Sequence, residues 1–206
     1  MAASNATRRR AVRSAALIAG LAPAVGLLLR ALLDRLGADP VEEITHETGE
    51  WALRFLILTL AVTPARRLLG WSWLAPERRT FGLVAFGYAS LHFATYLLLD
   101  LELDFSVLAE DILERPYITA GFAGFAALVP LAVTSTRASM KRLGARWIRI
   151  HRLVFVAAAA ACLHFLWGVK ADLLEPAIYT GIVATLVATR LRHLPGRSSI
   201  DSDPAR

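Results

Sequence analysis

Histidine is the residue type whose placement in this sequence most strongly suggests chemistry. Three of the five histidines, His92, His151 and His164, lie in long apolar segments. An imidazole away from water is costly unless its nitrogens are bonded, and ionisable groups inside membrane segments are candidates for function. On ideal helices, His92 and His164 fall at similar depths on two different segments, and His151 lies about 20 Å away. For a single buried histidine, the alternative use is a hydrogen bond between helices.

Two imidazoles at one depth on different helices are suited to hold the iron of a haem, a flat apolar macrocycle, between those helices. Zinc usually takes three or four protein ligands, and the apolar segments contain no Asp or Glu to complete such a set. Proton relays use chains of Asp, Glu and His, which are also missing. We therefore predict haem b with His92 and His164 as iron ligands, and no catalytic residue in this chain.

Arginines beside the apolar segments are candidates for binding anionic groups. Arg54 enters the second segment from its outer end, where its side chain either binds a haem propionate or extends to the membrane interface. A second group lies level with His151 and consists of Arg78, Arg79, Arg149 and Arg152. These four could bind propionates, a flavin phosphate or anionic lipid, or only orient the chain. The two remaining histidines, His46 and His193, are predicted to be solvated.

The elements that must position these residues are six apolar segments. The composition is 56% hydrophobic with a mean hydropathy of +0.49, which is high for a water-soluble domain. A helix needs about 20 residues to cross a bilayer, so the second and sixth segments need flanking residues to complete a crossing. The segments are 14–33, 51–65, 80–99, 117–133, 150–168 and 176–189.

The charges between the segments alternate in sign at every crossing. The stretches 1–13, 66–79 and 134–149 and the tail after the last segment together hold 17 basic and 3 acidic residues. The stretches 34–50, 100–116 and 169–175 hold 3 basic and 14 acidic residues. Because basic loops stay in the cytoplasm, we predict an all-α integral membrane protein with six transmembrane helices and both termini cytoplasmic. The net charge of +6 then reflects orientation and does not indicate nucleic-acid binding.

These patterns divide the chain into three parts. We predict a basic cytoplasmic N-terminus at 1–13, a haem-binding membrane domain at 14–189, and a disordered cytoplasmic tail at 190–206. The first segment resembles a signal peptide, but we expect it to be retained as a span. The single cysteine, Cys162, excludes an internal disulfide and a C-x-x-C-H haem attachment. No P-loop or Gly-rich nucleotide fingerprint is present, and the short loops leave no room for a soluble catalytic domain.

Three runs, in this order over about residues 40–190, resemble the MsrQ (formerly YedZ) family. They are THETGEWALRFLILTLAVTPARRLLGW, ERRTFGL…LH and WIRIHRLVF…CLHF. Members of the family are haem-binding subunits in the bacterial inner membrane, related to the transmembrane domain of ferric reductases and NADPH oxidases. The resemblance implies a six-helix bundle with haem b and FMN. By position, the family's haem histidines fall on His92, His151 and His164.

The resemblance also implies a function. The chain would carry electrons from the quinone pool, or from a cytoplasmic flavin reductase, to MsrP, a periplasmic molybdopterin enzyme that reduces methionine sulfoxide in oxidised proteins. It would be an electron-transfer subunit without catalysis of its own, and its acidic loops 34–50 and 100–116 would dock a basic partner surface. One alternative is a stand-alone cytochrome b that acts as a quinol or ferric reductase. Another is a small transporter or scaffold whose histidines only join helices.

Two points stay open in the sequence. Larger relatives carry two histidines on the third segment, whereas this segment carries His92 alone. Toward the cytoplasmic side of His92, where a second histidine would be expected, the chain has Arg78 and Arg79. An inner haem would therefore need another ligand, or His151 helps to seat a flavin or quinone. On one regular helix His151 and His164 point roughly 140° apart, so either their cofactors lie on different sides or a π-bulge interrupts 157–161. The small residues of 121–127 are expected to pack helices within the bundle.

Overall fold

The computed structural model describes residues 2–169 and 172–191, and this part of the chain is helical with no strand. The predicted tail at 190–206 lies outside the described residues beyond its first two positions, and so does His193. The helices are α1 (Ala2–Leu32), α2 (Pro40–Leu68), η1 (Ser72–Glu77), α3 (Arg78–Thr95), η2 (Tyr96–Asp100), α4 (Phe105–Glu114), α5 (Pro116–Val133), α6 (Arg137–Leu143), α7 (Ala145–Ile150), α8 (Leu153–Gly168) and α9 (Leu174–Leu191).

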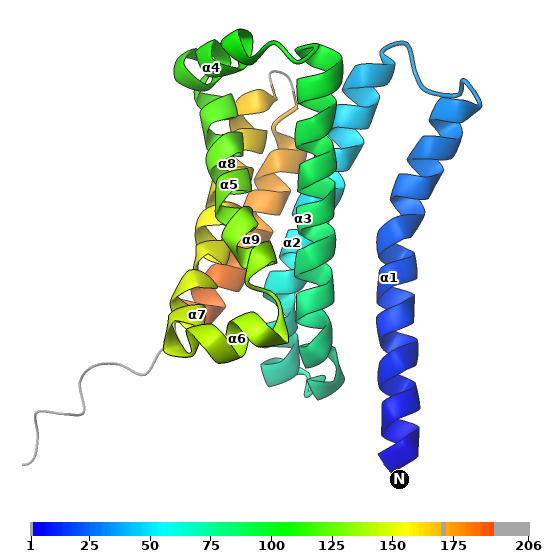
Figure 1. Cartoon of the computed structure of the whole chain (residues 1–206), viewed down its shortest axis with the longest axis vertical. Helices are drawn as coiled ribbons and strands as arrows, with labels where there is room; N and C mark the ends of the chain where they lie inside the picture. Colours follow the sequence, from blue (N-terminus) through cyan, green and yellow to red (C-terminus); the bar gives the residue numbers. More distant parts are fainter. Residues whose placement is uncertain (1, 170–171, 192–206) are drawn as a thin grey trace, which may run out of the picture.

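Five of the long helices form a closed ring in the order α2, α3, α5, α8 and α9. The ring closes because α9 packs on both α8 and α2, while α3 joins α2 to α5. The long helices run alternately up and down, with α4 across the upper end and α6 and α7 across the lower end (Figure 1). Helix α1 stands outside the ring against α3, α2 and η1. The prediction of an all-α bundle is therefore confirmed.

Four helical segments in the described residues are long and apolar enough to cross a membrane. Helices α2 and α9 do not combine the length and the hydropathy of such a span, in agreement with the shortness of the second and sixth apolar segments. Glu47, Glu50 and Arg54 lie in the first half of α2 and lower its hydropathy. Six spans and cytoplasmic termini remain predictions. The four candidate spans are Arg10–Leu32, Ser72–Asp100, Pro116–Val133 and Ala145–Gly168.

Local sequence signals set several helix ends. Asp39 caps α2, because its Oδ1 accepts a hydrogen bond of 3.0 Å from the Glu42 N–H, and a proline follows it in the first turn. Asp104 caps α4 in the same way. Gly144, with φ of +51°, separates α6 from α7 because a left-handed residue ends a helix. His151 lies in the turn between α7 and α8 rather than on either helix.

A proline inside a helix has no N–H, so the carbonyl four residues before it lacks its hydrogen-bond donor. In α2 a side chain of another helix donates to this carbonyl instead. Pro64 has no N–H to give to the carbonyl of Leu60, which is fully buried. Arg190 of α9 donates from Nη2 to this oxygen at 2.9 Å and to Thr63 Oγ1 at 2.9 Å. Arg190 therefore ties the lower half of α2 to α9.

Tyr88 of α3 attaches α1 to the ring by a hydroxyl inserted beside Pro23. The hydroxyl donates to the Gly20 carbonyl at 2.7 Å and accepts from the Ala24 N–H at 3.0 Å. These two groups are four residues apart, so the hydroxyl bridges a position where a helical hydrogen bond would otherwise form. The contact joins the two helices at a point that is otherwise apolar.

Replacing Tyr88 with phenylalanine should loosen α1 without disturbing the aromatic core. The Tyr88 ring stacks on Phe55 with centroids 5.8 Å apart, and phenylalanine keeps this contact. We expect a loss of about 0.5–1.5 kcal/mol, the usual contribution of one hydrogen bond. Thermal unfolding in detergent, followed together with proteolysis of α1, measures it. An unchanged melting temperature with unchanged protection of α1 would contradict this role.

Candidate functional site

His92 of α3 and His164 of α8 lie together inside the ring. Their ring centroids are 5.8 Å apart and the ring planes make an angle of 77°. A metal–imidazole bond is about 2 Å long, so two imidazoles on opposite sides of one metal ion have centroids about 6 Å apart. The distance between the two rings therefore suits a single ion between them.

A backbone carbonyl of a neighbouring helix holds each of these rings. His92 Nδ1 lies 2.8 Å from the carbonyl oxygen of Thr45 on α2, and His164 Nδ1 lies 2.7 Å from that of Tyr117 on α5. Because a carbonyl only accepts, each Nδ1 carries the proton and donates. The lone pair is then on Nε2 in both rings, which is the form in which histidine binds a metal.

A glycine lies against each histidine ring. A Cβ at position 49 would lie 3.1 Å from both Cε1 and Nδ1 of His92. At position 121 it would lie 2.7 Å from Nδ1 and 3.0 Å from Cε1 of His164. The rings can therefore rest on α2 and α5 because these two positions have no side chain.

The site residues that our sequence reasoning missed are the carbonyls of Thr45 and Tyr117 and the two glycines. The small residues of 121–127 were assigned to helix packing, which is correct for Gly124, where a Cβ would lie 3.4 Å from that of Ala160. A repeat in the sequence could have pointed to the two glycines, since Leu-His-Phe occurs at 91–93 and again at 163–165. The positions matched by this 72-residue offset are Thr45 and Tyr117, Gly49 and Gly121, and His92 and His164.

The residues around the pair fit a haem. The donors are two neutral imidazoles, and the glycines leave flat helix surfaces beside them. Phe93, next to His92, stacks on Phe125 of α5 with centroids 5.1 Å apart and lies 6.2 Å from Phe122. An apolar surface with two nitrogen ligands suits an apolar macrocycle whose iron takes axial histidines.

His151 does not join this pair. It precedes α8, whereas His164 lies near the other end of that helix, and its ring stacks on Trp147 with centroids 3.8 Å apart. Helix α8 is regular over 157–161, so the π-bulge alternative is not observed; the π-helix in the described residues is η2, which extends α3. Because His151 lies in a turn, it does not continue the helix of His164, and the roughly 140° between them on one regular helix does not describe their relation.

The predicted arginines have different surroundings. Arg78, at the start of α3, is partly buried and lies near enough to His151 for its positive charge to repel a protonated imidazole there. Arg79 and Arg152 are exposed. Arg54 donates from Nε to the Tyr179 hydroxyl at 2.8 Å and from Nη2 to a carboxyl oxygen of α2 at 2.6 Å. Its guanidinium thus joins α2 to α9, and binding of a propionate by Arg54 remains a prediction.

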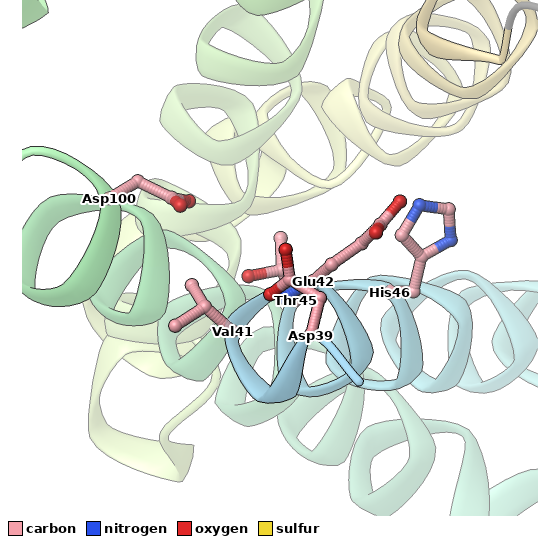
Figure 2. A pocket seen from close by; sticks show the side chains of 6 residues that line it. All are labelled: Asp39, Val41, Glu42, Thr45, His46 and Asp100. Atoms are coloured by element: carbon pink, nitrogen blue, oxygen red, sulfur yellow. Dashed lines mark hydrogen bonds between the residues drawn. The ribbon is translucent and has the colours of Figure 1, made fainter. Parts of the chain in front are cut away.

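An acidic pocket of about 450 Å³ opens at the upper end of the bundle, next to the backbone that holds His92. Residues from the start of α2 face Asp100 at the end of η2 (Figure 2). Within the described residues, its three carboxylates take part in no ion pair. Thr45 links the pocket to the histidine pair, since it lines the pocket and its carbonyl accepts from His92. The lining residues are Asp39, Val41, Glu42, Thr45, His46 and Asp100.

Comparison with known proteins identifies relatives over most of the chain. Residues 48–162 match the family described as ferric reductase like transmembrane component. A protein-methionine-sulfoxide reductase heme-binding subunit MsrQ from Xanthomonas oryzae pv. oryzae (strain MAFF 311018) is 54% identical over 157 residues, 76% of this chain and 72% of the relative. The protein of the same name from Herminiimonas arsenicoxydans is 48% identical over 183 residues, 87% and 84% of the two chains. No solved structure matches.

Proposed function

Since this chain belongs to the MsrQ family of ferric reductase-like membrane proteins, we propose that it is the haem-binding electron-transfer subunit of a protein-methionine-sulfoxide reductase system. The proposed location is the bacterial inner membrane, which the chain crosses several times. The observation that carries the proposal is the pair of imidazoles 5.8 Å apart, each with Nδ1 bonded to a carbonyl. Haem b, when bound there, would supply reversible one-electron transfer.

The proposed role of His92 and His164 is to hold the haem iron through Nε2. With two histidine ligands the iron would have no open coordination position, which would favour electron transfer over oxygen chemistry. The carbonyls of Thr45 and Tyr117 orient the rings and fix their tautomer. The chain itself reduces no sulfoxide, and the reaction takes place on the partner enzyme.

The basic lower end is proposed to receive the electrons, either from the quinone pool or from a cytoplasmic flavin reductase. His151 and the arginines around it, Arg78, Arg79 and Arg152, supply cations and a ring stacked on Trp147. A flavin phosphate is the group that such cations would hold if the chain also binds FMN, since arginine matches phosphate geometry. Anionic lipid is the other ligand proposed for this end.

The acidic upper end is proposed to receive a periplasmic molybdopterin reductase of the MsrP type. The pocket of Figure 2 lies at this end, and its carboxylates are free of ion pairs within the described residues. A basic surface on the partner would be steered to it. Its proximity to Thr45, and through Thr45 to His92, makes it the favoured point of electron exit.

Reoxidation of the purified, dithionite-reduced protein by its partner tests the function. We expect rapid loss of the reduced haem spectrum when both the molybdopterin reductase and a methionine sulfoxide substrate are added. Either component alone should give only a slow change. Reoxidation by ferric iron or quinone, with no response to the reductase, would instead support the stand-alone cytochrome b.

Neutralising the pocket should slow this reaction. We expect Glu42→Gln with Asp100→Asn to lower the bimolecular rate about tenfold at low ionic strength, because charged surfaces steer association. The difference should nearly vanish in about 0.5 M salt, where the charges are screened. The matched control, Ala138→Lys with Met140→Lys on exposed positions of α6, makes the same change in net charge at the other end. Equal slowing by both pairs would contradict docking at the pocket.

A further inference from the structure

The two histidines of the site rest on neighbouring helices in the same way. Each ring bonds the carbonyl of one residue and covers the glycine four positions later, Gly49 for His92 and Gly121 for His164. In both cases the histidine follows its carbonyl partner by 47 residues. The arrangement therefore occurs twice, once between α2 and α3 and once between α5 and α8.

Helix geometry explains why the fourth residue is glycine. A helical carbonyl uses one lone pair for the N–H four residues later and keeps a second lone pair free. The Cα–Cβ bond of that later residue tilts toward the helix N-terminus, so its side chain covers the free lone pair. Glycine at this position leaves that side of the carbonyl open, and a histidine of the next helix can then donate to it. The Thr45 carbonyl accepts in addition from the Thr48 hydroxyl at 3.0 Å.

We infer that Gly49 and Gly121 are positioning residues for the axial ligands of the proposed haem, an assignment that rests on the proposed function. Each glycine admits the ring to the carbonyl, and the resulting Nδ1–H bond leaves Nε2 free for the iron. This bond also makes the imidazole more basic. A more basic ligand favours ferric iron, so the two glycines keep the reduction potential low.

The distances predict unequal effects for the two positions. At position 121 a Cβ would lie 2.7 Å from a ring atom of His164, and so the ring must move. At position 49 the shortest distance to His92 is 3.1 Å, which a shift of a few tenths of an ångström relieves. Alanine should therefore disturb the site more at Gly121 than at Gly49.

Four glycine-to-alanine variants of the full chain test the inference. Gly124→Ala is the packing control on the same helix as Gly121, with its nearest contact at 3.4 Å, and Gly87→Ala on α3 is the open control, with nothing within 4 Å. Haem content, the low-temperature paramagnetic resonance spectrum of the ferric protein and the reduction potential are measured. We expect Gly121→Ala to bind haem about 10–100-fold more weakly, the usual cost of losing a ligand's supporting bond. Its remaining haem should have a raised potential and an altered spectrum.

Gly49→Ala should move the spectrum and the potential in the same direction by a smaller amount, and both controls should match the wild type. If the Gly121→Ala protein fails to assemble, the Gly49→Ala variant becomes the test of the inference. An unchanged spectrum and an unchanged reduction potential in Gly49→Ala would then overturn it. Gly121→Ala that matches Gly124→Ala in haem content, spectrum and potential also overturns it, whatever the melting temperatures. A wild type without low-spin bis-histidine haem contradicts the proposed function instead, so the two failures are distinguishable.

Discussion

Alanine in place of either His92 or His164 is expected to remove haem from the purified protein. Each ring would supply one of two axial bonds to the same iron, so one substitution breaks the site as fully as the other. Losing a supporting group outside the ligands already costs about 10–100-fold in affinity, and the loss of a ligand itself should cost at least as much. The haem-to-protein ratio, measured by the pyridine haemochrome spectrum, gives the result.

Two other histidines serve as controls for this prediction. His46→Ala changes an exposed ring that lines the acidic pocket at the same end of the bundle, and it should keep the full haem content. His151→Ala should keep the haem held by the pair, since its ring lies in the turn before α8. Full haem in both His92→Ala and His164→Ala would show that these rings only join helices.

Arg190→Met is expected to destabilise the bundle by about 1.5–3 kcal/mol, the range for a hydrogen bond from a charged group. The substitution leaves the Leu60 carbonyl without the donor that Pro64 cannot provide, in a place that water does not reach. Methionine fills similar space, so lost packing contributes little. The midpoint of thermal unfolding in detergent, converted with the unfolding enthalpy, measures the change.

A second substitution separates this cause from a general loss of charge. Pro64→Ala returns a backbone N–H to position 64, which can bond the Leu60 carbonyl along the helix. Arg190→Met should therefore cost much less in the Pro64→Ala background than in the wild type. Equal costs in the two backgrounds would contradict the role given to Arg190.

Much of the fold and the closeness of His92 to His164 could be predicted from the sequence. Long apolar segments and a rise of 1.5 Å per residue were enough to place His92 and His164 at one depth, and the structure brings these rings together. The family resemblance is confirmed by relatives at 48–54% identity. Charge alternation predicts six spans, of which four meet the criterion of length and hydropathy in the described residues.

Other features depend on contacts between distant residues. The sequence left Arg54 with two uses, a haem propionate or the membrane interface, and it did not predict the bond to Tyr179, which is 125 residues away in the chain. The turn at His151 was missed because the sequence there contains no glycine or proline to end a helix. The carbonyls that hold the histidines belong to the backbone, so no side-chain pattern reveals them. The 72-residue repeat is the sequence signal that could have pointed to Gly49 and Gly121, but the role of these glycines becomes clear only from the packed helices.

The most direct test of the central claim is the low-temperature paramagnetic resonance spectrum of the ferric protein. The claim is that His92 and His164 bind one iron. If the rings kept their angle of 77° on the iron, two iron d orbitals would lie close in energy, so we expect a low-spin signal with a large maximum g value in the wild type. This same signal should disappear in both His92→Ala and His164→Ala and persist in His151→Ala. A high-spin wild type, or a low-spin signal that survives either of the first two substitutions, would contradict the claim.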